Sequence, residues 1–340
     1  MFDMYELLDT LMAVRAPSGR EYRLAEKITE LLTPFVDKCW TDRVGNVIGF
    51  IEGEGENKKK VLFGAHMDEV GMIVTYIEGN GYVRFTNDGG PNMFSAEYRE
   101  VVFENGARGM IVPQNGSEGS PWNNCVVDIG AHSKEEAEAL VSVGETFAPI
   151  SSLMHMAGST VAGRPVDDRV GCAVQLMAAE RISARGKRPY HDIYFAFTVQ
   201  EELALPAMGA GVVAYAVQPD VGIAIDVCGT GDTIGAVPMA MKVGGGLSIL
   251  VRDTTIIADK GLVDTLTALA KDNNLPYQYE VSTTGGVDAV PMQKTGLGCK
   301  AGVISVPMRY LHTSAETMDL TDAEGCVTLT AALCDCPVIG

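Results

Sequence analysis

The N-terminal part of the chain predicts two amphipathic helices followed by strands. Apolar residues recur at three- and four-residue steps in MFDMYELLDTLMAV and in EYRLAEKITELLTPFV, where Pro34 ends the pattern. Ser18 and Glu21 stand three residues apart at the start of the second segment and predict a capping box. The apolar runs NVIGFIEG and KKKVLFGAH then predict two strands separated by a charged turn.

The pattern changes between Gly71 and about Ala157, where helical periodicity nearly vanishes. Short strands such as MIVTYI, YVRFT, EVVFE and RGMIVP alternate there with turns rich in Gly, Asn and Asp. One helix is expected, SKEEAEALVSV, with a capping box formed by Ser133 and Glu136. We therefore expect a small β-rich domain, residues 70–161, inserted into a main domain made of residues 1–69 and 162–340.

Alternation of helices and strands resumes after Gly163. The expected helices are DRVGCAVQLMAAERI, LVDTLTALAKDNN and TDAEGCVTLTAALC, and the expected strands are DIYFAFTV, VGIAIDV and AGVISV. Strands that are apolar throughout and alternate with helices are typical of a parallel sheet buried on both faces. The predicted fold class is therefore α/β, with a mostly parallel sheet that is covered by helices on both faces.

Composition and charge narrow the classes of function. The 340 residues include 46% hydrophobic and 21% charged residues, as in an ordinary globular protein. The formal net charge is −18, because 44 acidic residues oppose 26 basic ones. Such a surface repels phosphates and argues against binding of nucleic acid. Most of the excess acidic residues are explained as surface charges that keep the protein soluble, and some of them can neutralise bound cations.

Cysteine usage and hydropathy favour a cytoplasmic protein. The eight cysteines include no CxxC pair, and residues such as Cys172 lie within apolar helical patterns, so reduced thiols are expected. The acidic, amphipathic N-terminus is unlike a signal peptide. The longest mostly apolar run, Leu203–Val217, contains Pro206 and is shorter than the roughly 18 residues that cross a membrane. We expect no membrane partner.

Acidic residues and histidines follow the apolar strands and precede one helix. They are His66, Asp68, Asp167, Asp168, Glu201, Glu202, Asp226 and His312. In open α/β sheets, ligands bind beyond the carboxyl ends of the strands. Each residue alone has a structural explanation, since an acid pair can be a solvated strand end, an Asp a helix N-cap and a lone histidine a core residue. Their gathering at one edge of one sheet predicts a functional site.

The remaining histidines are assigned structural roles. His132, His155 and His191 lie in turn-like or domain-joining segments rather than at strand ends. The ligand set at the strand ends is therefore two imidazoles with carboxylates and no thiolate, which suits zinc, cobalt or manganese in a hydrolytic site.

The charge count supports two divalent ions. Asp167, Glu202 and Asp226 supply three negative charges against four positive ones, which leaves one positive charge for a bound hydroxide. In two-metal sites, a carboxylate commonly bridges the ions, and the ions together hold the attacking and leaving oxygens.

Five ordered motifs resemble a known family. GAHMDEVG, GRPVDDRVGC, TVQEE, AIDV and MRYLHTSAE occur in the order typical of the dinuclear metallo-aminopeptidases represented by glutamyl aminopeptidase and the tetrahedral (TET) aminopeptidases. Some members of that family are labelled cellulase M or endoglucanase. The resemblance covers nearly the whole chain, including PSGRE near the start and GGVDA at residues 285–289.

The resemblance implies a set of metal ligands. His66 and Asp226 would bind one metal as terminal ligands. Glu202 and His312 would bind the other, and Asp167 would bridge both. The cofactors implied are two divalent ions per subunit, zinc or cobalt before manganese.

The resemblance also implies roles for the neighbouring acids. Asp168 would follow a cis peptide bond. Asp68 would accept the free N–H of His66 and fix its tautomer. Glu201 would act as the general base that takes a proton from the bridging water and returns it to the leaving amine.

For the insertion, the resemblance implies a PDZ-like domain used for self-association. Dimers formed through residues 70–161 would build a twelve-subunit shell whose enclosed sites admit short peptides. The chain departs from the family in EELALPAMGA, where the common sequence is Glu-Glu-Val-Gly-Leu-Arg-Gly-Ala. Val287 also replaces a common Thr, and MKVGGGLS replaces a Gly-Lys-Gly-Pro-like turn. None of these departures removes an expected ligand.

Three functions fit these residues unequally. An aminopeptidase that acts on short peptides is the first hypothesis. A related dinuclear amide deacylase, or a catalytically impaired assembly scaffold of the same fold, is the alternative. Glycoside hydrolysis fits poorly, because that chemistry uses two positioned carboxyl groups and no metal.

Overall fold

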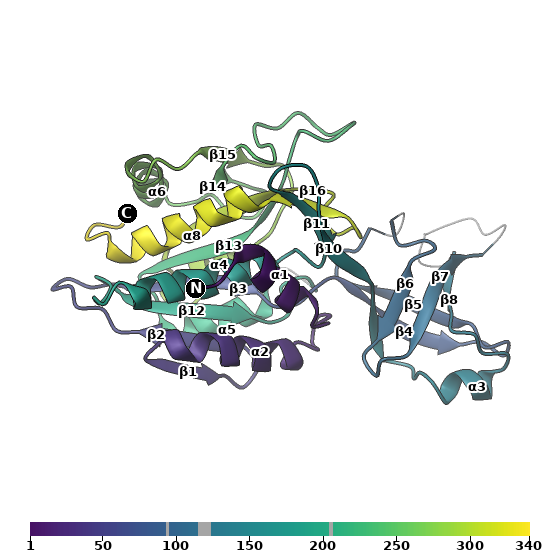
Figure 1. Ribbon diagram of the computed structural model, residues 1–340. Coiled ribbons are helices and arrows are strands. Elements are labelled where there is room, and N and C mark those ends of the chain that lie inside the picture. The colour runs from purple at the N-terminus through teal and green to yellow at the C-terminus, as the bar shows by residue number, and fades with distance from the viewer. Residues whose placement is uncertain (93–94, 115–123, 204–206) are drawn as a thin grey trace.

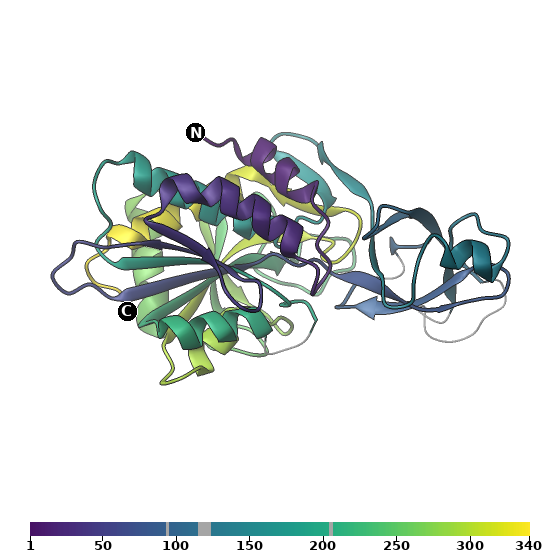
Figure 2. The same ribbon diagram turned by 90° about the horizontal axis from the view of Figure 1, so that it is seen from below.

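The computed structural model describes residues 1–92, 95–114, 124–203 and 207–340. These residues form a large α/β body from which a small β-domain projects to one side (Figures 1 and 2). Part of the departing segment EELALPAMGA, residues 204–206, lies outside the described residues.

An eleven-stranded mixed sheet forms the centre of the large body (Figure 1). Nine of its strands follow one another in the order β1 (Lys38–Thr41), β2 (Val47–Ile51), β12 (Asp192–Thr198), β3 (Lys60–His66), β13 (Val221–Gly229), β16 (Lys300–Arg309), β17 (Glu316–Asp319), β11 (Thr160–Arg164) and β10 (Ser151–His155). In addition, β14 (Leu247–Arg252) pairs with β16, and β15 (Tyr277–Val281) pairs with β14.

The sheet is mixed, so the prediction of a mostly parallel sheet holds only for part of it. The central strands β12, β3, β13 and β16 are parallel to one another, as are β14 and β15. Both flanks are antiparallel. The connections from β1 to β2, from β10 to β11 and from β16 to β17 are too short for the crossover that a parallel pair requires.

Helices cover both faces of the sheet (Figure 2). One face carries α1 (Met4–Met12), α2 (Tyr22–Leu32), α4 (Arg169–Ala184), α6 (Lys260–Asp272) and α8 (Leu320–Asp335), and the other carries α5 (Met208–Val217) and α7 (Ala289–Lys294). A short 3₁₀ turn, η1 (Thr33–Phe35), follows α2. Apolar side chains of both helix layers pack on the sheet, as expected for an α/β fold.

The projecting domain is a closed six-stranded barrel. Its strands, in barrel order, are β4 (Gly71–Ile77), β5 (Val83–Asp88), β8 (Cys125–Asp128), β7 (Arg108–Pro113), β6 (Glu100–Phe103) and β9 (Thr146–Pro149), and it carries helix α3 (Lys134–Glu138). Strand β9 closes the barrel because it pairs with both β4 and β6. The rings of Phe85 and Phe103 pack against Phe147 in its core.

Two details of the insertion differ from expectation. A closed barrel does not confirm the PDZ-like architecture. Strand β10 lies within the expected insertion of residues 70–161, yet it pairs with β11 in the large sheet. The barrel strands themselves run from Gly71 to Pro149.

Of the capping boxes predicted at Ser18 and Ser133, only Ser133 caps its helix. Ser133 accepts a hydrogen bond from the Glu136 N–H at the start of α3. Ser18 does not cap α2, because its hydroxyl donates instead to Asp68 Oδ2 at 2.7 Å. Glu21 Oε1 accepts from the N–H groups of Gly19 and Gln200. Both side chains thus contact segments near the strand ends instead of completing a helix cap.

All eight cysteines are free. Within the ranges that the structure describes, no helix combines the length and the apolar character needed to cross a bilayer.

Candidate metal centre

All seven residues expected to bind metal or act in catalysis meet at the carboxyl edge of the central strands. His66 ends β3, Asp226 lies in β13, and Glu201 and Glu202 follow β12. Asp68 follows β3, Asp167 precedes α4, and His312 follows β16. Except for Asp68, which lies behind them, these side chains line one cavity of about 790 Å³.

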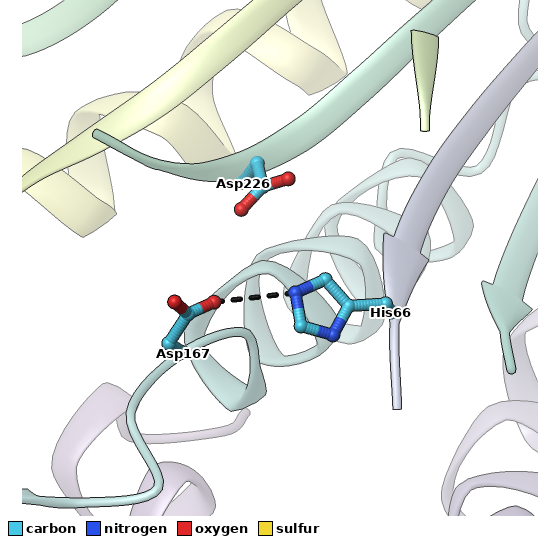
Figure 3. A group of neighbouring side chains, drawn as sticks. All are labelled: His66, Asp167 and Asp226. Atoms are coloured by element: carbon cyan, nitrogen blue, oxygen red, sulfur yellow. Dashed lines mark ion pairs between the residues drawn. The ribbon is translucent and has the colours of Figure 1, made fainter. Parts of the chain in front are cut away.

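The ligating atoms form two groups that share Asp167. His66, Asp167 and Asp226 make up the first group, whose side chains converge in Figure 3. Asp167, Glu202 and His312 make up the second. In each group, one atom per residue lies within 4.8 Å of the others. Two adjacent cation sites that share one carboxylate would have this arrangement.

Short contacts join the two groups through Asp167. His66 Nε2 lies 3.2 Å from Asp167 Oδ1, the contact drawn in Figure 3, and His312 Nε2 lies 3.3 Å from Asp167 Oδ2. His312 Nε2 is also 3.4 Å from Glu202 Oε2. The two oxygens of Asp167 therefore face different histidines, as a bridging carboxylate requires.

Burial and mutual repulsion disfavour the ionised form of most acids in this cluster. Burial raises the pKa of Glu202 to about 8, and it raises the pKa values of Glu201 and Asp226 well above their usual range. Asp167 is the exception, because hydrogen bonds from His312 and His66 outweigh its burial and lower its pKa. One buried carboxylate oxygen of Glu201 and one of Glu202 have no hydrogen-bond partner. These features fit cation binding, which neutralises the charges and satisfies the oxygens.

Backbone carbonyls orient both histidines. His66 Nδ1 lies 3.0 Å from the Asp68 carbonyl oxygen and 3.5 Å from the Asp68 carboxylate. His312 Nδ1 lies 2.9 Å from the carbonyl oxygen of Gly90, which follows barrel strand β5. A donor–carbonyl contact at Nδ1 leaves Nε2 of each ring free to bind a cation.

The Asp68 carboxylate does more than the expected contact with His66. Its Oδ1 accepts the N–H of Glu201 and its Oδ2 accepts the N–H of Glu202, both at 3.0 Å. Oδ2 also accepts the hydroxyl of Ser18. Asp68 therefore fixes the backbone that carries both glutamates, and its nearest contact with His66 is through the carbonyl.

A second buried acid holds the loop that carries Asp167. Glu316 Oε2 accepts the N–H of Val166 at 2.7 Å and that of Asp167 at 3.2 Å. The Asp167–Asp168 peptide bond is cis, as the family resemblance implies. Asp168 Oδ1 then accepts the N–H of Gly171 and caps α4. The shared ligand is thus fixed from both sides.

Sequence reasoning did not identify several residues that shape the site. They are Ser18, Glu21, Gly90, Asp288 and Glu316. Asp288 is buried and accepts the hydroxyl of Thr198 at the end of β12. Glu316 lies within the motif MRYLHTSAE and Asp288 within GGVDA. The family motifs therefore include both residues, but the sequence alone does not indicate what each side chain contacts. Gly90 has no such signal, because only its backbone takes part.

The other histidines take structural contacts outside the cluster. His155 stacks on Tyr5 with 4.0 Å between ring centroids. His191 accepts the N–H of Lys59 and contacts the carbonyl oxygen of Cys336.

Glu201 differs from the ligand groups in its position. It is absent from both groups, yet its Oε2 lies 4.0 Å from His66 Nε2 and its side chain lines the same cavity. A carboxylate that faces a bound water without binding the cations can move a proton. The arrangement therefore separates ligands from a base and suits metal-assisted hydrolysis.

Comparisons with known proteins find aminopeptidases that match over most of the chain. Residues 45–329 match the family described as M42 glutamyl aminopeptidase. A candidate aminopeptidase of Acetivibrio thermocellus is 37% identical over 330 residues, which is 96% of this chain and 97% of that protein.

Solved structures match over nearly the whole chain. An aminopeptidase from the archaeon Desulfurococcus kamchatkensis has a TM-score of 0.92 and 32% identity, covering 98% of this chain and 94% of that chain. The TET1 peptidase of Pyrococcus horikoshii has a TM-score of 0.85 and 33% identity, covering 98% and 99%. That peptidase assembles into a tetrahedron or a large octahedral shell.

Proposed function

The chain belongs to the M42 glutamyl aminopeptidase family, a group of hydrolases that act as exopeptidases, and we propose that it removes N-terminal residues from short peptides at a centre of two divalent cations. The observation that carries this proposal is the sharing of Asp167 between two ligand groups. One carboxylate whose two oxygens face two histidines, in a cluster of otherwise repelling acids, supports a ligand shared by two cations.

The residues present fit a pair of cations. His66 and Asp226 would hold one and Glu202 and His312 the other, with Asp167 shared. Zinc or cobalt is the proposed occupant, with manganese also compatible with the imidazole and carboxylate donors. When bound, such cations lower the pKa of a water molecule and polarise the carbonyl of the scissile bond.

Glu201 is the proposed general base. Its carboxylate accepts a proton from the attacking water and returns that proton to the leaving amine, so the base is regenerated in each turnover. Burial in the cavity raises the pKa of Glu201, and neighbouring acids add to this effect, which matches a group that must hold a proton briefly at neutral pH. Asp68 accepts a hydrogen bond from the Glu201 N–H and so fixes the backbone from which the Glu201 side chain extends.

Self-association through the barrel is part of the proposal. The Pyrococcus horikoshii relative assembles into a tetrahedron or a large octahedral shell, and the barrel of this chain projects to one side of the large body (Figure 1). We infer dimers formed through residues 70–161 that build a dodecamer. Enclosed active sites would then restrict substrates to short peptides.

Chelation and substrate blocking together test the proposal. Removing metal should abolish hydrolysis of short peptides and amino-acid anilides, and adding Zn²⁺ or Co²⁺ should restore it. An N-acetylated copy of each substrate serves as the control, because an aminopeptidase requires the free amine. Equal cleavage of the acetylated substrate would identify a deacylase. If the metal-loaded protein cleaves none of these substrates, the chain is a catalytically impaired scaffold.

A further inference from the structure

The cavity of the candidate centre extends well beyond the residues that would bind metal. Leu250, Val287 and Val303 line it, and so do two further acids, Asp253 and Glu280, which belong to neither ligand group. We propose that this extension receives a basic N-terminal side chain, lysine or arginine, and that Glu280 selects it. The inference rests on the proposed aminopeptidase function and adds the substrate class.

Strand register places Glu280 beside the reacting centre. Ser305 of β16 is the direct partner of Asp226 on the neighbouring parallel strand β13. The Ser305 hydroxyl donates to Glu280 Oε2 at 3.1 Å. Adjacent strands lie about 5 Å apart, so the Glu280 carboxyl lies one strand spacing and one hydrogen bond to the side of a proposed metal ligand. A lysine or arginine side chain whose backbone carbonyl is at the metals can reach that distance.

The charged side chains that line the extension are acidic. Among the described residues that line the cavity, none is a lysine or an arginine. The acids of the two ligand groups would be neutralised by cations, whereas Glu280 and Asp253 have no cation partner there. Glu280 is only 8% exposed and Asp253 only 3%. Because a buried carboxylate is costly without a counter-charge, a substrate cation would relieve that cost.

The apolar residues that line the extension suit the aliphatic part of a lysine or arginine side chain. Leu250, Val287 and Val303 are buried apolar residues that line the cavity, which suits the methylene stem of lysine or arginine. An acidic substrate side chain would meet like charges in the same space. The extension therefore favours a cation over both a neutral and an acidic N-terminal residue.

Glu280 and Asp253 contribute differently. Asp253 Oδ1 accepts the N–H groups of Thr255 and Ile256 and so holds a turn. Glu280 accepts a side-chain hydroxyl and lies beside the side chains of Cys228 and Ser248. Replacing Glu280 removes the charge without removing a backbone contact, and it is therefore the better test position.

Wild-type selectivity is the first measurement. Anilides of lysine, arginine, norleucine and glutamate are compared by kcat/KM in metal-loaded protein. Norleucine has the aliphatic chain of lysine without the ammonium group, so the lysine-to-norleucine ratio isolates the charge. We expect a ratio of about 10 or more, the usual value of a hydrogen bond to a charged group. Inhibition by lysinamide and norleucinamide gives the same comparison without turnover.

Glu280→Gln is the second measurement, because glutamine keeps the oxygen that accepts from Ser305. The lysine-to-norleucine ratio should fall by about 10- to 100-fold. Asp232→Asn is the matched control, since it also removes one negative charge but from an exposed acid that pairs with Arg309 outside the cavity. The control should leave the ratio unchanged.

The outcomes separate this inference from the proposed function. A wild-type preference for norleucine or glutamate, or a ratio that Glu280→Gln does not change, overturns the inference while anilide hydrolysis itself upholds the aminopeptidase. Absence of hydrolysis for all four anilides overturns both. If Glu280→Gln fails to fold, the wild-type ratio and the inhibition by the two amides still decide the matter.

Discussion

Asp68 binds the backbone of both glutamates that follow β12, and this contact organises the site at the scale of single residues. Adjacent carboxylates at a strand end would ordinarily be solvated. Here the N–H groups of Glu201 and Glu202 are held by the two oxygens of one buried aspartate. The pair is therefore held in the position that the proposed roles require, with Glu202 facing a cation and Glu201 facing the attacking water.

Asp68→Asn tests this organising role. Asparagine has a single acceptor oxygen, so one of the two glutamate N–H groups must lose its partner. We expect kcat to fall by about 10- to 100-fold, with weaker metal binding, as for residues that orient metal ligands. Ser18→Ala is the control, because it removes one donor to Asp68 and leaves both backbone contacts in place. Equal losses in the two variants would contradict the account.

Glu280 gives a prediction on pH and stability. Burial, with help from the charge of Asp253, raises its pKa from 4.5 to about 7. The neutral carboxyl is therefore favoured in the folded state. The stability that protonated Glu280 contributes is fully present below about pH 4.5 and is lost as the pH rises to about 7. Relative to Glu280→Gln, cation-free wild type should lose roughly 2–3 kcal/mol over that range.

Urea unfolding of both proteins at the two ends of the range measures this loss. Glutamine does not titrate, so the variant subtracts the pH effects of all other groups. A difference between the two proteins that is independent of pH would show that the Glu280 carboxyl is not perturbed by folding.

At the scale of elements, the junction between β12 and α5 positions the glutamates. Asn46 accepts the N–H of Val199 through Oδ1 and donates through Nδ2 to the carbonyl of Gly209. The Gly209 N–H in turn donates to the Val199 carbonyl. The first turn of α5 thus lies directly against the end of the strand that leads to Glu201.

Substitution of two glycines in α5 tests that close approach. A Cβ at Gly209 would lie 2.4 Å from Asn46 Oδ1 and 2.5 Å from the Val199 nitrogen, whereas one at Gly211 would have no neighbour nearer than 3.5 Å. Gly209→Ala should lower the unfolding free energy by about 1–3 kcal/mol and reduce kcat. Gly211→Ala should raise it by about 0.5–1 kcal/mol. Urea denaturation distinguishes them, and similar effects of both would contradict this packing.

Element-level patterns predicted some features and missed others for physical reasons. The strand ends that carry His66, Glu201 and Asp226 could be predicted, because continuous apolar runs end abruptly at polar residues. The antiparallel flanks could not, because strand pairing depends on contacts between distant segments. The Ser18 capping box failed since Asp68, fifty positions away, competes for the hydroxyl.

At the scale of the whole molecule, the segment that follows barrel strand β5 contacts the candidate metal centre. The Gly90 carbonyl contacts His312 Nδ1, and the His312 carbonyl accepts the N–H of Asn92. An ion pair between Arg20 and Glu104 also joins the two parts. The insertion therefore has a role in orienting a proposed ligand besides its proposed role in assembly.

Assembly through the barrel is testable on its exposed apolar side chains. Tyr98 and Met110 are 65% and 44% exposed and lie on the paired segments around β6 and β7. Light scattering of wild type should give twelve times the 36.2 kDa chain mass. Replacing both residues by aspartate should reduce the mass, because charges oppose burial in an interface. Ile234→Asp, on an exposed loop of the large body, is the control.

The central claim is that two cations are held by five residues while Glu201 moves the proton. The most direct test measures the metal content and turnover of Glu201→Gln beside Glu202→Gln. Glu201→Gln should keep two divalent ions per subunit and lose kcat by about 10²- to 10⁴-fold, whereas Glu202→Gln should lose metal. Normal turnover by Glu201→Gln, or loss of its metal, would contradict the division between ligand and base.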